Sequence, residues 1–588
     1  MKTNLNSKVI TERSLSADFV VVGGGLSGLC AAVAAARHGV SVILIQDRPM
    51  LGGNASSECR MGIMGAKGDN NKETGLLEEV QLDNIYRNPL MRYTLWDDAM
   101  LNLVISEPNI TLLLNTSVHE VLTENNAITT VKAWNCNEYC EYTVNGKLFA
   151  DCSGDGILRL SGAEFRIGRE DAKEFGEHCL HEGNDDKTMG NSILLQLRRC
   201  TEHRPFIPPP WALKFTDEDF VVPESEKNDG RIHSFKRLYP DNNNFWWIEY
   251  GGNIDTIADA GDIQRKLKAI AYGVWDYMKN HPDGRCKDYE LDWIGSLPGK
   301  RESTRFIGDY MLSQNDIMNN VHFPDVVAYG GWTLDDHHPD AFFRKGFLST
   351  HDKAPSPFDI PYRCLYSKNI DNLLFAGRNI SCTHLGMSAT RVMATCALLG
   401  QAVGTAAAVA LHHGTTPRGV YESHIAELQK ILEDDDVMLP GRWRAVSPMT
   451  ASAATTCPAL QNGIDRFWNN DDNGCWLEPQ ENVEYTWDTP QTISSCRFIF
   501  DTELSTQGKR MRKLEALPDY KPMPPVLTRD FHIDAFVNGE WKTVATMKEN
   551  FHRLLRLSFP AVSTTRLHFV LDQSWGAPKA HLFAWDVL

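Results

Sequence analysis

Close to the N-terminus the chain carries a regular succession of apolar and small residues. Residues 19–22 are Phe-Val-Val-Val, residues 29–37 are rich in alanine, and residues 40–45 are apolar again apart from Ser41. Short apolar runs are typical of buried strands, whereas an alanine-rich segment that stops at a glycine is typical of a helix packed on a sheet. The pattern therefore predicts a strand, a helix and a second strand of a parallel α/β sheet.

Later segments extend this prediction. Residues 110–150 alternate between apolar and polar in short bursts, which indicates further strands. Residues 262–279 place apolar side chains at helical spacing, which predicts an amphipathic helix. Residues 393–411 are apolar enough to cross a bilayer, but they include a glutamine and two spaced glycines and lack flanking aromatic residues. We therefore expect a buried helix there and no membrane span.

Together the segments predict an α/β protein with three domains. A Rossmann-like nucleotide-binding domain is expected from residues 17–165 and 361–440, an inserted α+β substrate domain from residues 166–360, and an all-β sandwich from residues 446–588. A length of 588 residues agrees with this division, because one hydrophobic core rarely serves so long a chain.

Charge and cysteine content narrow the classes of function. The chain has 59 basic and 76 acidic residues, and the resulting net charge of -17 makes nucleic acid an unfavourable partner. Its 14 cysteines lack the paired spacing of a metal centre, so we expect buried thiols and no metal site. Residues 1–17 are polar and of mixed charge, without the apolar core of a signal peptide, which predicts a cytoplasmic location.

The turn between the first strand and the first helix has the glycine spacing of a dinucleotide-binding motif. Gly23 permits the tight turn, Gly25 lets the backbone approach phosphates, and Gly28 lets the helix pack closely on the strand. Phosphate oxygens are then expected at the helix N-terminus, where free N–H groups and the helix dipole favour negative charge. Gln46 and Asp47 follow the second strand, where an acceptor for the ribose hydroxyls is expected.

Three further blocks combine glycine with a polar residue after a predicted strand. They are the Gly52-Gly53 pair, the segment 148–156 with Asp155, and the segment 373–378 with Gly377 and Arg378. Together with the glycine turn, these blocks resemble the FAD-dependent oxidoreductase family, which is distantly related to the fumarate reductase and succinate dehydrogenase flavoproteins. The resemblance covers about residues 17 to 440 and implies FAD as the cofactor.

The resemblance also implies which residues contact FAD. We expect cofactor binding by Gly23, Gly25, Gly28, Gln46, Asp47, Gly52, Gly53, Arg60, Asp155, Gly377, Arg378 and Gln401. Related flavoproteins usually have glutamate in place of Gln46. Since glutamine offers one carbonyl oxygen and a competing NH2 group, Asp47 is the alternative ribose ligand.

The segment from residue 446 onward resembles the discoidin-like, galactose-binding type of β-sandwich. This resemblance implies either a sugar-binding module or a packed appendage.

Two candidate catalytic residues lie around the start of the apolar helix. His384 follows the 373–378 turn and is predicted to act as a base toward a substrate hydroxyl group. The alternative that it only fills or caps its loop stays open. Arg391 is expected near a helix N-terminus, where the dipole does not favour a cation, so we expect it to contact FAD or an anionic substrate.

Two more candidates lie within one short segment. Arg301 and Arg305 would share a helix face, and the pair is suited to bind a carboxylate or a hydroxyl-rich substrate. A structural ion network with Glu302 or Asp309 is the alternative. The polar segment 335–339 either lines the substrate site or forms an exposed turn, and its adjacent histidines would point to opposite faces of a strand.

These observations predict a FAD-dependent oxidoreductase that oxidises a secondary alcohol of a sugar or glycoside. A hydride would pass to flavin N5 while His384 takes the hydroxyl proton. Two alternatives remain: a flavin-dependent reductase of an unsaturated carboxylate that uses Arg301, Arg305 and Arg391, and a carbohydrate-binding or assembly protein in which FAD is structural. The expected partner is a small molecule, and the electron acceptor is left open.

Overall fold

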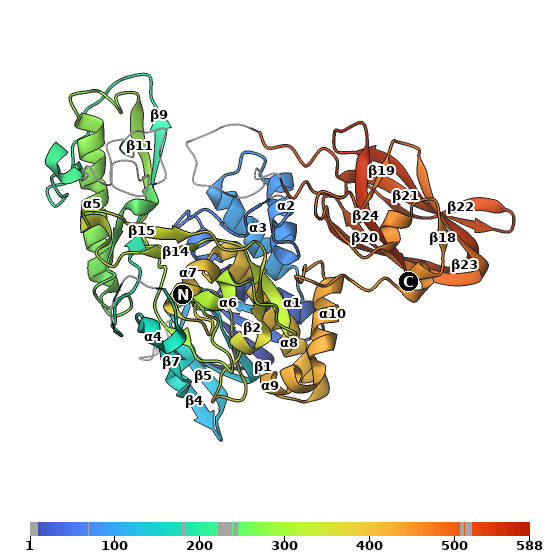
Figure 1. Cartoon of the computed structure of the whole chain (residues 1–588), viewed down its shortest axis with the longest axis horizontal. Helices are drawn as coiled ribbons and strands as arrows, with labels where there is room; N and C mark the ends of the chain where they lie inside the picture. The colour runs from blue at the N-terminus through green and yellow to red at the C-terminus, as the bar shows by residue number, and fades with distance from the viewer. Residues whose placement is uncertain are drawn as a thin grey trace, which may run out of the picture.

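A seven-stranded mixed sheet forms the centre of the computed structural model (Figure 1). The structure describes residues 10–68, 70–178, 181, 183–221, 238, 245–505, 511 and 520–588. Its parallel strands are β3 (Ile110–Leu113), β2 (Val42–Ile45), β1 (Thr11–Val22), β6 (Cys140–Asp151) and β17 (Leu373–Phe375), in this order across the sheet. β5 (Ala127–Asn135) pairs with the first half of β6, and β4 (Thr116–Glu124) follows as the antiparallel edge.

Two long apolar helices pack against each other beside this sheet. α1 (Leu26–Arg37) and α8 (Met393–His413) approach closely because α8 has glycine where they meet. A Cβ added at Gly400 would lie 2.0 Å from the carbonyl oxygen of Ser27, and one at Gly404 would lie 2.1 Å from that of Ala31. The predicted strand, helix and second strand at residues 19–45 are confirmed.

α8 is also the segment whose apolar run matched a membrane span in length. Among the described residues it is the one helix that is long and apolar enough to cross a bilayer, and 94% of its most apolar window is buried inside the protein. This burial confirms the predicted core helix. The other helices around the sheet are α2 (Leu76–Arg87), α3 (Tyr93–Ile105), α7 (His384–Thr390), α9 (Pro417–Gly419), the π-helical turn η10 (Val420–His424) and α10 (Ile425–Asp434).

The inserted region has a hydrophobic core of its own around α5 (Ala260–Asn280). This helix buries the side chains that the sequence predicted for its apolar face, namely Ile263, Leu267, Ile270, Ala271, Val274 and Tyr277. They pack beside the ribbon of β9 (Leu195–Arg199) and β11 (Tyr289–Ile294). A second ribbon, β14 (Leu334–His337) with β15 (Ser349–Asp352), leads back toward the central sheet (Figure 1).

Other parts of the predicted insertion join the central core instead. β13 (Val326–Gly330) pairs with β16 (Phe358–Pro361), and both contribute buried residues to the hydrophobic cluster of the central sheet. The remaining short elements here are β7 (Phe165–Arg166), α4 (Ala172–Phe175), β8 (Asn191–Ser192), β10 (Glu249–Tyr250), β12 (Arg305–Phe306) and α6 (Gln314–Met318).

The C-terminal region is an antiparallel β-structure, as predicted. Its strand order is β19 (Cys475–Leu477), β24 (Ala580–Val587), β20 (Asn482–Phe500), β23 (Leu554–Ser574), β21 (Thr528–Val537) and β22 (Glu540–Met547), while β18 (Ala454–Thr455) pairs with β20. Register shifts interrupt the pairing of the two longest strands, β20 and β23, and such irregularities bend strands around a core. That core is rich in aromatic side chains and includes Tyr485, Phe498, Phe531, Phe569 and Trp585.

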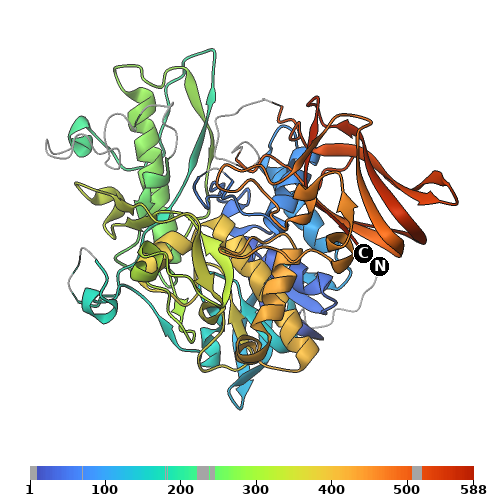
Figure 2. The same ribbon diagram turned by 45° about the vertical axis from the view of Figure 1, so that its right-hand side comes forward.

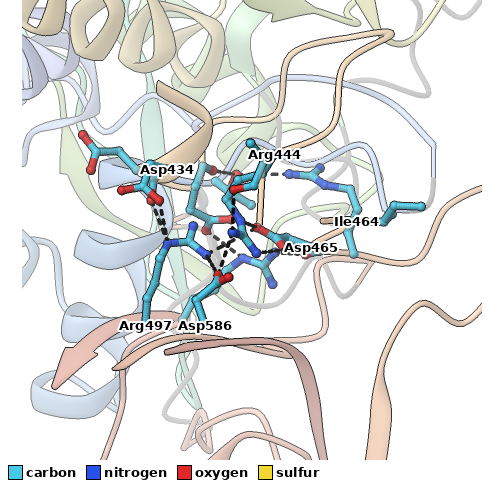
Figure 3. A network of polar contacts seen from close by, with 12 residues as sticks. Asp434, Arg444, Ile464, Asp465, Arg497 and Asp586 are labelled. Atoms are coloured by element: carbon cyan, nitrogen blue, oxygen red, sulfur yellow. Dashed lines mark hydrogen bonds and ion pairs between the residues drawn. The ribbon is translucent and has the colours of Figure 1, made fainter. Parts of the chain in front are cut away.

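Buried ion pairs fix this C-terminal region to the rest of the protein (Figure 3). Arg444 contacts Asp465 at 2.9 Å and Asp586 at 2.6 Å. Arg497 donates from Nε to the carbonyl oxygen of Asp434, the last residue of α10, at 2.9 Å. Both views place the inserted region and the C-terminal region on opposite sides of the central sheet (Figures 1 and 2).

Candidate functional site

A cavity of about 1030 Å³ lies at the carboxyl ends of the parallel strands. Its wall includes Val22 and Ile45, which end β1 and β2, and Cys152, which follows β6. Open α/β sheets bind their ligands at this edge. Trp246 from the inserted region and Leu504 from the C-terminal region complete the wall, so all three parts of the chain meet at one site.

The glycine turn lines the cavity and leaves room for a pyrophosphate at the N-terminus of α1. Gly25 caps α1, no side chain occupies the cap, and a Cβ added at Gly25 would meet no protein atom within 4 Å. The helix N-terminus therefore faces open space lined by backbone. Gly28 lies behind it, where a Cβ would come within 1.7 Å of the Gly23 carbonyl oxygen, so Gly28 serves the close packing predicted for it.

Two other glycine turns border the same space. Gly52 adopts a positive φ of 98° and donates its N–H to the Gly24 carbonyl oxygen at 2.8 Å. Gly53 lines the cavity next to it, and Gly377, with a φ of 119°, lines it from the turn after β17. The blocks that are far apart in the sequence are thus brought together as the family resemblance implied.

Gln46 and Asp47 have different roles at the place where an acceptor for the ribose hydroxyls was expected. The Gln46 carbonyl oxygen accepts the Gly24 N–H at 2.7 Å, and its amide donates to the Met50 carbonyl oxygen at 3.1 Å. Gln46 thereby supports the glycine turn with both of its polar atoms. Asp47 also lines the cavity and keeps 58% of its side chain exposed, which makes it the carboxylate available to a ribose.

Three charged side chains form a cluster in the cavity wall, and one of them, Asp155, follows β6. Asp155 contacts Arg378 at 2.7 Å and Lys300 at 2.6 Å, and all three residues line the cavity. Burial alone would raise the pKa of Asp155, but the two cations hold it below its usual value. Two cations against one carboxylate leave a net positive charge, which suits an anionic cofactor.

The cavity wall also carries a group of histidines and carboxylates that comes from β14 and β15 and contacts Glu249 of β10. His337 places Nδ1 2.8 Å from Glu249 and Nε2 3.2 Å from Asp335, while His351 Nε2 lies 3.2 Å from the second oxygen of Asp335. Burial disfavours a charged imidazole at His337, yet Glu249 and Asp335 raise its pKa above the ordinary value. Asp335 is also buried, but its pKa is lowered, chiefly by His337 and then by Arg391 and His351. The contacts therefore favour the imidazolium form of His337 and the carboxylate form of Asp335.

Two of the predicted arginines border this group. Arg301 is 5% exposed in its side chain and contacts Glu249 at 2.9 Å, and it donates to the Gly190 carbonyl oxygen at 2.8 Å. Arg391 donates from Nη2 to the Asp335 carbonyl oxygen at 2.9 Å. Arg391 Nε is buried without a hydrogen-bond partner. The site thus keeps one strong donor for a ligand.

The other two predicted catalytic residues, His384 and Arg305, do not line the cavity. His384 places Nδ1 3.0 Å from Glu302 and Nε2 2.9 Å from Asp336, and these carboxylates raise its pKa to about 10 although burial opposes the charge. Arg305 contacts the same Glu302 at 2.7 Å. The contacts match the alternatives that the sequence left open, a histidine that fills its loop and a structural ion network, because both ring nitrogens of His384 face carboxylates and Arg305 pairs with Glu302 and Glu170 inside the core.

Two predicted FAD ligands also lie away from the cavity wall. The Arg60 guanidinium stacks 4.2 Å from the Trp293 ring and 5.2 Å from that of Tyr93. Gln401 accepts the Leu76 N–H at 3.0 Å, which satisfies the start of α2. Each residue therefore has a packing role in the described structure, whereas the other predicted FAD residues except Gly28 line the cavity.

The sequence identifies the segment 335–339 as one that either lines the substrate site or forms an exposed turn, and the structure places its Asp335 and His337 in the cavity wall. Sequence reasoning missed their partners Glu249 and His351. Strand alternation supplied part of the signal, because it sends Asp335 and His337 to one face of β14 and Asp336 to the other, where Asp336 meets His384. Nothing in the sequence connects this strand with Glu249 or His351, which approach it only in the folded chain.

The parallel sheet, the glycine turn at a helix N-terminus and the cavity at the strand ends define a dinucleotide-binding α/β protein. A family model described as FAD dependent oxidoreductase matches residues 18–432, and the chain belongs to this family. The protein is accordingly an FAD-dependent oxidoreductase, and FAD is its cofactor.

Solved structures give more distant likenesses. A geranylgeranyl bacteriochlorophyll reductase-like protein of Thermoplasma acidophilum is 12% identical with a TM-score of 0.33, and the match covers 72% of this chain and 85% of that one. The quinol fumarate reductase FrdA of E. coli is 13% identical with a TM-score of 0.27, covering 72% and 75%. A family 32 carbohydrate-binding module of Streptococcus pneumoniae EndoD is 13% identical with a TM-score of 0.19, covering 24% and 99%. No curated protein matches the chain.

Proposed function

We propose that this FAD-dependent oxidoreductase oxidises a secondary alcohol of a carbohydrate-type substrate. The observation that carries the proposal is the group of Asp335, His337 and His351 in the cavity wall. A substrate hydroxyl group can accept a hydrogen bond from Arg391 Nε, which is buried without a hydrogen-bond partner, while its own proton faces the pair of His351 and Asp335. Trp246 and Trp332 line the same cavity and offer the apolar ring faces that suit the C–H face of a sugar.

The residues of this group have distinct roles in the proposal. His351 accepts the hydroxyl proton, and the ionised Asp335 beside it favours the imidazolium that forms. His337 is less suited to serve as the base, because its pKa is raised and both of its ring nitrogens face carboxylates. Together with Arg391, it favours the negative charge that develops on the alcohol oxygen. FAD, when bound, supplies the acceptor for the hydride that leaves the carbinol carbon.

Other residues of the cavity wall provide the proposed contacts with FAD. Gly25 and the N-terminus of α1 face the pyrophosphate, and Asp47 accepts hydrogen bonds from the ribose. Lys300 and Arg378 supply positive charge along the wall. Because the proposal assigns these residues to FAD, the group around Asp335 is available to bind the substrate.

Reduction of an unsaturated carboxylate is the second candidate, because Arg301, Arg391 and His337 gather three cations near the cavity. Glu249 and Asp335 oppose an anionic substrate there, since both carboxylates lie within the same group. A neutral polyhydroxy substrate avoids this repulsion. Alcohol oxidation is therefore the better match to the geometry.

An anaerobic titration separates the two candidates. The purified protein is mixed with sugars, glycosides and hydroxy acids, and bleaching of the flavin absorbance is recorded. Alcohol oxidation predicts bleaching by at least one sugar or glycoside. If instead unsaturated acids reoxidise the chemically reduced flavin and no sugar bleaches it, the reductase is correct. A protein that neither contains FAD nor takes it up contradicts both candidates.

A further inference from the structure

Outside the flavin cavity, three side chains with metal-ligating atoms converge where α8 ends and α10 begins. His413 is the last residue of α8, His424 ends the π-helical turn η10, and Glu427 lies in the first turn of α10. The donor atoms of the three residues all lie within 4.8 Å of one another.

The carboxylate of Glu427 lies between the two imidazoles. Its Oε2 atom is 2.8 Å from His413 Nε2 and 3.8 Å from His424 Nδ1. The two rings are stacked, with centroids 3.8 Å apart and an angle of 14° between their planes. The stack thus holds ring nitrogens of both histidines near the same carboxylate.

One of the three residues belongs to an unusual backbone turn, and all three side chains are partly exposed to solvent. The five residues of η10 are wound as a π-helix, an uncommon turn that is frequent at functional sites, and it ends on His424. The side chains of His413, His424 and Glu427 are 30%, 26% and 43% exposed. An ion can consequently reach the three donor atoms without unfolding of either helix.

We propose that His413, His424 and Glu427 bind a divalent transition-metal ion of the Zn²⁺ type. Two imidazole nitrogens and one carboxylate oxygen are ligands that zinc prefers, and a water molecule completes a tetrahedron. Metal–ligand bonds of about 2.0–2.2 Å place neighbouring donors of such a site roughly 3.4 Å apart, so small rotations of these side chains suffice. The ion ties α8, which packs on α1, to α10, whose last residue accepts from Arg497 (Figure 3).

The test uses the purified full-length protein, stripped with a chelator and dialysed. Isothermal titration with Zn²⁺ is expected to show one ion per chain, and Co²⁺ is expected to give the visible absorption of a tetrahedral site. His424→Asn and Glu427→Gln are each expected to weaken Zn²⁺ binding roughly 100-fold, at the upper end of what even supporting residues of metal sites cost. His412→Gln is the matched control, because it changes a neighbouring exposed histidine outside the three donors.

Melting temperatures complete the test, since a folded protein with an intact flavin spectrum shows that a variant has not simply unfolded. Zn²⁺ is expected to raise the melting temperature of the wild type and of His412→Gln but not of the other two variants. Binding is also expected to weaken as the pH is lowered, because metal ligands must be deprotonated. The proposal is overturned if no stoichiometric binding occurs, or if binding survives both donor substitutions unchanged.

Discussion

At the scale of single residues, histidines with similar carboxylate neighbours have different consequences. His384 is enclosed between Glu302 and Asp336 inside the core. His351 contacts Asp335, and both of these residues line the cavity. The first arrangement stabilises the fold and the second can exchange a proton with a ligand. The distinction depends on what surrounds each ring and not on its sequence neighbours.

The first prediction concerns His351. His351→Gln is expected to retain the flavin spectrum but to lose roughly 100- to 10,000-fold in the rate of flavin reduction by substrate, the usual range for a general base. Stopped-flow measurement under anaerobic conditions gives this rate directly. His119→Gln, at an exposed position on β4, should leave it unchanged. A His351→Gln enzyme of normal rate would remove this residue from the mechanism.

His384 should influence stability and its dependence on pH. Its pKa is about 10 in the folded protein against 6.5 ordinarily, so the stabilisation from its charge is complete below pH 6.5 and is lost as the pH rises through about 10. His384→Gln leaves Asp336 without this cation and Glu302 with Arg305 alone, and it should cost about 3–5 kcal/mol at pH 7. Denaturant unfolding at pH 7 to 10 tests both points: the wild type should weaken with rising pH, and the variant should lack this slope.

At the scale of elements, local patterns predicted most of the fold. The strand–helix–strand unit at residues 19–45 and the amphipathic face of α5 follow from neighbours in the sequence, and both are confirmed. The cavity wall was predicted at the glycine turns and at polar residues that follow the strands, such as Asp47, Asp155 and Arg378. The group around Asp335 joins Glu249, His337 and His351 through the pairing of short ribbons, and no local pattern encodes that pairing.

The close packing of α1 against α8 leads to a prediction about stability and FAD binding. Gly400→Ala and Gly404→Ala both force a Cβ against a backbone oxygen of α1, so each should cost about 1–3 kcal/mol in unfolding free energy. Gly400 meets Ser27 in the first turn of α1, at the cavity, while Gly404 meets Ala31 one turn deeper. Only Gly400→Ala should therefore also weaken FAD binding, by roughly 10-fold if about 1.4 kcal/mol reaches the site.

Flavin fluorescence titration measures this difference, and thermal melts of the apoprotein measure the shared loss of stability. Equal FAD affinity in the two variants would show that the first turn of α1 adjusts without disturbing the cofactor.

At the scale of the whole molecule, the C-terminal region is part of the flavin cavity. Leu504 lines the cavity, and Thr502 donates to Glu78, another lining residue, at 2.6 Å. Arg466 is 3% exposed and donates to the carbonyl oxygens of Asn70 and Lys72 and to the Thr74 hydroxyl. The ion network of Figure 3 fixes the same region to the end of α10.

Arg466→Lys should thus alter the flavin site from a distance. One ammonium group cannot reach the three acceptors that the guanidinium serves, so the segment 70–74 should loosen, and Lys72 of that segment lines the cavity. We expect weaker FAD binding and a higher KM with a smaller change in kcat. The control is Arg566→Lys, whose side chain pairs with Glu484 within the C-terminal region. Wild-type FAD affinity in Arg466→Lys would contradict this coupling.

The position of Leu504 and Arg466 also has a consequence for the order of events during synthesis. Both residues follow the glycine turn and every strand of the central sheet in the sequence, so they leave the ribosome after those parts. Until residues 466 and 504 have been translated, the cavity wall lacks Leu504 and the segment 70–74 lacks the hydrogen bonds that Arg466 donates.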